Sequence, residues 1–290
     1  MNEQVCKADM GGGGAAGVDT CGYPVETTGN TVLDILERRS STRAFARDDN
    51  DRPVAVTDEQ RTAILHAASR APSAGAMMMY SIVSIREQAT LDRLADLCDH
   101  QPMIAKAPWA LIFVVDYAKW IDLFEHVGCF EPEFVERTGK SPRRAPGLGD
   151  FAIAAQDAVI AAQNAVVAAE ALGLGSCYIG DVVENAEEVA ELLDLPPYTM
   201  PLSMLIIGTP RKERPAIAHP VVNLVHEERY RRADDATMDA QVAEMDAMFR
   251  PHAREAGERV VDIYTRKHTS PFMAEMSRSM EWWFKNWLGK

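Results

Sequence analysis

Two arginines and a serine stand on alternate positions in the segment Arg39–Arg43, which we call the arginine segment. Alternate side chains of an extended chain share a side, so Arg39, Ser41 and Arg43 could face one ligand together. Guanidinium groups donate paired hydrogen bonds to phosphate, so the expected ligand carries a phosphate. The alternative is a solvated charge run after a helix, where arginine complements the helix dipole. The residues alone leave these two interpretations equal.

Two stretches of small residues could let a flat ligand approach the backbone. The first is Ala71–Ala76, which begins where Pro72 ends a predicted helix. The second is Gly173–Asp181, where glycines flank a short predicted strand and backbone N–H groups could face a ligand. A tight turn is the simpler interpretation of each stretch.

Other site chemistries lack their sequence patterns. The seven histidines have no H-x-x-x-H or H-E-x-x-H spacing, so no metal site is predicted. The five cysteines include no C-x-x-C pair, which argues against a disulfide scaffold and favours a reducing cytoplasm. A net charge of −13 argues against general nucleic-acid binding. Neither a G-x-S-x-G elbow nor a Walker A sequence occurs.

The elements that would position these residues are helices mixed with at least four strands, which gives an α+β class. Periodicity and end signals predict helices over Val32–Arg39, Thr57–Ala71, Leu91–Cys98 and Asp150–Leu172, another from Asn185, and a last one from Ser270-Pro271. Strands are predicted over Ser81–Ile85, Trp109–Val115, Ser176–Gly180 and Ser203–Gly208. Capping boxes are predicted for Thr57 with Gln60 and for Asn185 with Glu188.

The helix Asp150–Leu172 is apolar apart from one narrow stripe. Its polar residues fall at Gln156/Asp157, Gln163/Asn164 and Glu170, about seven residues apart. A helix of this kind is buried on most sides, in a core or at a subunit interface. The polar interruptions argue against a membrane span.

The last helix carries an apolar stripe of Met276, Met280, Trp283 and Trp287. We expect this stripe to pack on the body or on a partner subunit, with contact to a membrane surface as the alternative. The chain is divided into a flexible tail over 1–30, a main domain over 31–230 and a C-terminal helical extension over 231–290. Residues 117–150 form a helical excursion and loop, either a lid or a plain surface insertion.

Taken in order, three stretches resemble the FMN-dependent nitroreductase family. They are Arg39-Ser-Ser-Thr-Arg-Ala-Phe45, Ala71-Pro-Ser-Ala-Gly75 and Ala168-Ala-Glu-Ala-Leu-Gly-Leu-Gly-Ser-Cys-Tyr-Ile-Gly180, closed by Leu205-Ile-Ile-Gly208 with Pro210. The resemblance covers roughly residues 31–230. It implies a nitroreductase-like fold with a central mixed or antiparallel sheet flanked by helices, and an intertwined homodimer with FMN at the interface.

The resemblance also implies roles for individual residues. Arg39 and Ser41, with Ser40 beside them, would hold the FMN phosphate, and Arg43 would lie near the pyrimidine end of the flavin. The partner subunit would contribute Pro72, Ser73, Ala74 and Ala76, and the backbone of Tyr178, Ile179 and Gly180 would reach flavin N5. A basic residue after the last strand would also bind phosphate. Its candidates are Arg211, Lys212, Arg214 and His219, with Arg214 as our choice.

One departure from the family pattern lies after the Pro-Ser turn. The family often has asparagine and then glutamine-proline-tryptophan there, whereas this chain has Ala76-Met-Met-Met-Tyr80. A polar contact from the asparagine to the flavin ring is therefore missing or replaced. The methionines could form an adaptable wall for an aromatic acceptor or pack in the core. Trp120, Phe124 and Phe130 would belong to the lid.

The activity implied by the resemblance is electron transfer from NADH or NADPH through FMN to a nitroaromatic, a quinone or a similar acceptor, by a ping-pong mechanism. No catalytic side chain is expected, because the flavin carries the chemistry and a nearby arginine favours its anionic reduced form. Alternatives are flavin fragmentation, reductive dehalogenation, ene reduction, or flavin binding without turnover.

Overall fold

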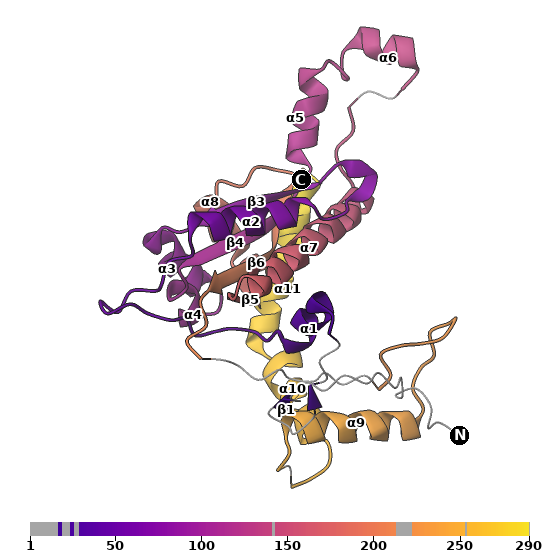
Figure 1. The fold of residues 1–290 in the computed structure, drawn as a ribbon. Coiled ribbons are helices and arrows are strands. Elements are labelled where there is room, and N and C mark those ends of the chain that lie inside the picture. The colour runs from indigo at the N-terminus through magenta and orange to yellow at the C-terminus, as the bar shows by residue number, and fades with distance from the viewer. Residues whose placement is uncertain are drawn as a thin grey trace.

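A four-stranded antiparallel sheet forms the centre of the molecule (Figure 1). A computed structural model describes residues 17–18, 24–25, 29–140, 143–212, 222–252 and 254–289. The strands lie in the order β3 (Tyr80–Ile85), β4 (Trp109–Asp116), β6 (Thr199–Gly208) and β5 (Gly175–Ile179). All neighbouring pairs are antiparallel. The predicted α+β class is confirmed, and β6 begins four residues earlier than predicted.

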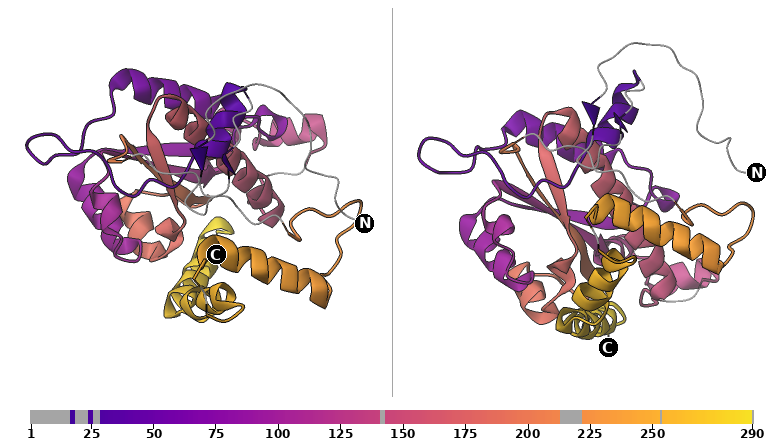
Figure 2. Two further views of the ribbon diagram at one scale, coloured as in Figure 1. Left: turned by 60° about the horizontal axis from the view of Figure 1, so that its bottom comes forward. Right: turned by 90° about the horizontal axis from the view of Figure 1, so that it is seen from below.

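Helices cover the sheet on both sides, and β4 shows why its sequence is so apolar. All eight residues of β4 are buried, as a strand enclosed on both faces requires. Helix α7 (Leu148–Ala171) contacts every strand of the sheet, and α2 (Asp58–Ser69) packs on α7. Helix α11 (Pro271–Trp287) lies on the opposite side (Figure 2).

Small side chains let α7 approach the sheet closely. Ala154, Ala158, Ala161 and Ala165 are fully buried at helical spacing. By length and composition α7 could also cross a membrane. Its buried alanine face identifies it as a core helix, as predicted. Its other face is exposed and carries Ile153, Val159 and Ile160.

Local signals fixed several helix ends. The predicted capping box of α2 is confirmed, since the Gln60 N–H donates to Thr57 Oγ1 at 3.2 Å and the Thr57 N–H donates to Gln60 Oε1 at 3.0 Å. The remaining helices of the main body are α1 (Thr31–Arg38), α3 (Gln88–Leu97), α4 (Pro102–Ala105) and α8 (Ala186–Leu192), with short 3-10 turns η1 (Ala74–Ala76) and η2 (Asp181–Val183).

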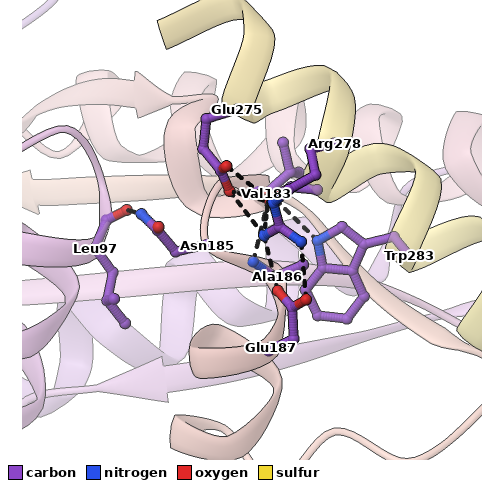
Figure 3. Close-up of polar contacts among 9 residues, drawn as sticks. Leu97, Val183, Asn185, Ala186, Glu187, Glu275, Arg278 and Trp283 are labelled. Atoms are coloured by element: carbon purple, nitrogen blue, oxygen red, sulfur yellow. Dashed lines mark hydrogen bonds and ion pairs between the residues drawn. The ribbon is translucent and has the colours of Figure 1, made fainter.

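The predicted capping box at Asn185 is wrong. Asn185 precedes α8 in a left-handed conformation, and its side chain does not cap the helix. It donates instead to the Leu97 carbonyl at 2.8 Å, which ties α8 to the end of α3 (Figure 3). The hydroxyl of Ser279 on α11 accepts the Ala186 N–H at 3.2 Å in its place. A tertiary partner has replaced the local cap.

The C-terminal region contains α9 (Asp235–Phe249), α10 (Glu258–Ile263), a π-helical turn η3 (Tyr264–His268) and α11. Trp283 and Trp287 of α11 are fully buried in the body. Their Nε1–H groups donate to the carbonyls of Val183 at 2.9 Å and Gly147 at 3.0 Å. Packing of the apolar stripe on the body is therefore confirmed.

Two predicted segments need separate description. The excursion over 117–150 contains two helices, α5 (Ala118–His126) and α6 (Pro132–Thr138), where one short helix and a loop were expected (Figure 1). Within the predicted tail, β1 (Gly17–Val18) pairs with β2 (Pro24–Val25). Most of the tail lies outside the described residues, so its flexibility stays a prediction.

Candidate functional site

The arginine segment leaves α1 as extended chain and is anchored through Thr42. Arg39 caps α1 and turns to an extended conformation with ψ of 140°. Thr42 is buried, and its N–H donates to the Ser176 carbonyl of β5 at 2.8 Å. Ser41 and Arg43 flank Thr42, so alternation directs them away from the side on which Thr42 is buried. The predicted shared face is consistent with this geometry.

A close contact fixes where the arginine segment crosses β5. A Cβ atom on Gly175 would lie 2.1 Å from Thr42 Oγ1 and 2.7 Å from Thr42 Cβ. Only glycine therefore permits this crossing. The closing stretch of the family pattern lies beside the same segment, since the Arg211 N–H donates to the Ala44 carbonyl at 3.0 Å.

A cavity of about 290 Å³ adjoins the arginine segment, and Arg38, Ser40, Thr42 and Glu170 are among the residues that line it. Burial raises the pKa of Glu170, and the positive charges of Arg39 and Arg38 oppose that shift. Glu170 Oε1 is buried without a hydrogen-bond partner among the described residues. The corner therefore combines two cationic side chains, a serine and a concavity, which are the features that a phosphate-bearing ligand requires.

The end of β5 lies next to this corner. Burial raises the pKa of Tyr178 to about 12, with Arg39 opposing the shift, and the Tyr178 hydroxyl donates to Gln163 Oε1 at 3.3 Å. Ile179 is buried, and Gly180 is exposed. No atom lies within 4 Å of the position that a Cβ on Gly180 would take. A flat ligand could therefore reach the backbone there.

The Pro-Ser stretch leads into a strained turn, Ser73–Tyr80, which we call the methionine turn. Gly75, Ala76 and Met78 all have positive φ values, of 58°, 56° and 46°. For a residue other than glycine this conformation costs on the order of 1–3 kcal/mol and persists only where neighbouring structure enforces it. Such strain is typical of ligand-contacting turns. The exposed small residues Ala74 and Ala76 lie in this turn, as predicted.

Side chains from two helices hold the methionine turn. Asp157 of α7 is 2% exposed and accepts the N–H groups of Ala74 at 3.0 Å and Met79 at 3.3 Å. From α5, Trp120 Nε1–H donates to the Met77 carbonyl at 2.9 Å, and Lys119 Nζ donates to the Tyr80 carbonyl. Sequence analysis missed the role of Asp157. The available signal was a lone carboxylate in the middle of an apolar helix.

The predicted lid begins at this contact. Trp120, Phe124 and Phe130 form a chain of ring contacts, with centroids 5.5 and 6.3 Å apart. This aromatic cluster extends from the methionine turn into the α5–α6 excursion. The role of the excursion as a lid remains a prediction.

The predicted site residues form two groups within one chain. The arginine segment and Tyr178–Gly180 lie together, whereas Pro72, Ser73, Ala74 and Ala76 lie at the methionine turn. Thirteen residues of α7 separate Asp157 at the turn from Glu170 at the corner, about 20 Å along the helix axis. No single group of a ligand can contact both. Arg214 and His219 lie outside the described residues, and Arg211 and Lys212 are exposed.

The described residues include no group of three or more histidine, cysteine, aspartate or glutamate side chains arranged to hold a metal ion. A nucleophile with an adjacent base is likewise not part of the geometry described above. The chemistry that this arrangement supports is the binding of a flat, phosphate-bearing cofactor, for which the cationic corner and the open backbone at Gly180 are suited.

Comparison with known proteins agrees with this chemistry. The Nitroreductase family model matches residues 36–209. An FMN reductase [NAD(P)H] of Bacillus subtilis is 33% identical, over 73% of this chain and 79% of that protein. An oxygen-insensitive NADPH nitroreductase of Salmonella typhimurium is 32% identical, over 73% and 81%.

Two solved structures have the same fold. The NADPH:FMN oxidoreductase of Vibrio harveyi, complexed with NAD+, superposes with a TM-score of 0.66 at 25% identity, over 86% of this chain and 97% of that one. The B. megaterium protein NfrA2 superposes with a TM-score of 0.67 at 26% identity, over the same shares.

Proposed function

Because this chain belongs to the nitroreductase family and is an NAD(P)H-dependent flavin oxidoreductase that uses FMN, we propose that it reduces nitroaromatics, quinones or similar electron-poor molecules by a ping-pong mechanism. The observation that carries the proposal is the cationic corner beside an open strand end. Arg39 and Ser41 extend from a segment locked by Thr42, and the exposed backbone of Gly180 lies at the neighbouring strand end.

In this proposal the residues of the chain bind, orient and tune. The arginine segment binds the phosphate, and the positive charge of Arg43 near the flavin ring makes the anionic reduced form easier to reach. Bound FMN supplies the hydride and electron chemistry itself. No residue needs to act as an acid or base triad. Donor and acceptor would use the same open face in turn, which gives ping-pong kinetics.

The proposal includes a homodimer in which each copy donates its methionine turn to the other copy's arginine segment. Its support is the exposed face of α7, where Ile153, Val159 and Ile160 are 42%, 47% and 39% exposed. Exposed apolar side chains gathered on one helix mark an interaction surface. The separation of about 20 Å between the two groups of site residues fits sites shared between copies.

The test begins with the absorption spectrum of the purified protein, which should show bound or reconstitutable FMN. NADH or NADPH should bleach that flavin under anaerobic conditions, and a nitroaromatic should restore its colour. Double-reciprocal plots at several acceptor concentrations should be parallel. A protein that binds FMN but is not bleached by either nucleotide would be a flavin-binding protein without turnover. A protein that takes up no FMN would refute the proposal.

Fragmentation, dehalogenation and ene reduction would be separated from nitro and quinone reduction by assaying the bleached enzyme against each substrate class. The aromatic cluster of α5 and the methionine turn favour an aromatic acceptor, because flat rings stack on such side chains.

A further inference from the structure

The methionine turn has a conformation that its own residues would not hold. Ala76 and Met78 have left-handed backbones, and this strain requires enforcement from outside the turn. Within the turn, Ser73 Oγ accepts the Met78 N–H at 3.2 Å. The other contacts come from α7 and α5.

Asp157 makes the most extensive of these contacts. Its two carboxylate oxygens divide between the two ends of the turn, Oδ1 accepting the N–H of Ala74 and Oδ2 that of Met79. One rigid group on a buried helix thus fixes the distance between the ends. A carboxylate that is 2% exposed is retained in a core only with strong partners, and backbone N–H groups supply them here.

We propose that Asp157 is a positioning residue for the flavin, acting through the methionine turn. This inference rests on the proposed function, in which Ser73, Ala74 and Ala76 contact the cofactor. Asp157 does not contact the flavin in this proposal. It sets the strained backbone on which those contacts depend.

The lid is tied to the same turn. Trp120 Nε1–H donates to the Met77 carbonyl, and Lys119 donates to the Tyr80 carbonyl while lying over the Tyr80 ring. The charges of Asp116 and Asp157 both favour the protonated form of Lys119. Asp157 therefore also supports the root of α5, so the turn and the excursion should shift together when Asp157 is altered.

The decisive variant is Asp157→Asn, which keeps the size of the side chain but places an amide NH₂ against a backbone N–H. We expect the Kd for FMN to rise at least tenfold and the visible circular dichroism of bound FMN to change. The matched control is Asn164→Ala, also on α7, which removes the hydrogen bond from Asn164 to the Ala67 carbonyl without touching the turn. That control should change the Kd less than twofold.

A spectroscopic change in the bound flavin separates positioning from general destabilisation, because a merely structural role would lower stability and leave the flavin signal intact. A folded Asp157→Asn protein with unchanged FMN affinity and circular dichroism would overturn the inference. Failure of the wild type to bind FMN would instead refute the proposed function.

Hydrogen exchange of the wild type without flavin provides a second test that needs no variant. Ala74 is an exposed residue, yet its amide should exchange slowly because Asp157 accepts its hydrogen. The Met79 amide should be protected as well. Free exchange of the Ala74 amide would overturn the inference even if Asp157→Asn were insoluble.

Discussion

Arg39 is the first residue of the chain's cationic corner, where α1 ends and extended backbone begins. Its positive charge acts on both Glu170 and Tyr178, which places it between the cavity and the end of β5. A guanidinium in this place can bind a phosphate while its neighbours exclude water.

Replacing Arg39 with alanine should weaken FMN binding by about 1.5–3 kcal/mol, the usual range for a charge-assisted hydrogen bond. Fluorescence titration of flavin into the apoprotein measures the effect. Arg47→Ala is the matched control, because Arg47 lies farther along the same stretch and pairs with Asp51 at the surface. Equal affinities for Arg39→Ala and wild type would remove Arg39 from the site.

Gly175→Ala tests whether the crossing of Thr42 and β5 positions the arginine segment. The new methyl group would meet Thr42 Oγ1 at 2.1 Å, so the segment must shift. We expect a loss of roughly 1–3 kcal/mol in unfolding free energy, typical of overpacking, together with weaker FMN binding. Urea denaturation and flavin titration measure both. Gly149→Ala, where no atom lies within 4 Å, should leave both unchanged, and the idea fails if Gly175→Ala behaves like it.

The sequence predicted the types and order of these residues but not the contacts that hold them. Alternation in Arg39–Arg43 and the glycine of β5 were visible in the chain. The clash that makes Gly175 obligatory depends on Thr42, 133 positions earlier. The role of Asp157 likewise depends on amides more than 75 positions away. Such contacts are tertiary, and local pattern does not encode them.

At the scale of elements, helix α11 docks beside a crowded group of carboxylates. Arg278 bridges Glu187 and Glu275 at the surface (Figure 3). Beneath them Glu184 is 7% exposed, and its Oε2 has no hydrogen-bond partner within the described part of the chain. Burial raises the pKa of Glu184 to about 7, and the charges of Asp99, Asp181 and Glu275 add to the shift while His100 opposes it.

This pKa gives stability a defined pH dependence. The folded state holds the Glu184 proton more tightly than the unfolded chain, whose ordinary pKa is 4.5. Stability from this group is therefore complete below about pH 4.5 and is lost as the pH rises to about 7. Glu184→Gln should gain about 1–3 kcal/mol relative to wild type on going from pH 5 to pH 8.

Urea denaturation at the two pH values measures this difference. Glu188→Gln serves as the control, because Glu188 is exposed on the first turn of α8 and forms a surface pair with Arg93. A gain for Glu184→Gln that is the same at both pH values would contradict the assigned pKa.

Elements were predicted more completely than their ends. Periodicity located the four strands of the sheet and the long helix, because each buries a continuous face. The ends depended on chemistry that competes with local rules. Thr57 capped its helix as predicted, whereas Asn185 found Leu97 and left its helix start to Ser279. A second helix in the 117–150 excursion was missed because its apolar residues are few.

For the whole molecule, the exposed apolar face of α7 predicts the oligomeric state. Wild type should sediment at twice the 32.0 kDa of one chain. Ile160→Glu places a charge in the middle of that face, so it should yield a monomer that no longer retains FMN. Sedimentation velocity with detection at flavin wavelengths measures both. Met273→Glu, a similar change on exposed α11, should remain dimeric. A monomeric wild type, or a dimeric Ile160→Glu, would contradict the shared site.

The contact between Trp287 and Gly147 joins the last helix to the residue that caps α7, 140 positions earlier. During synthesis the central helix must therefore emerge and wait, its first turn uncovered, until nearly three hundred codons have been read. An apolar helix left open for that interval is a natural client for a chaperone. Clipping a few residues beyond Phe284 would leave the ribosome's product permanently in that unfinished state.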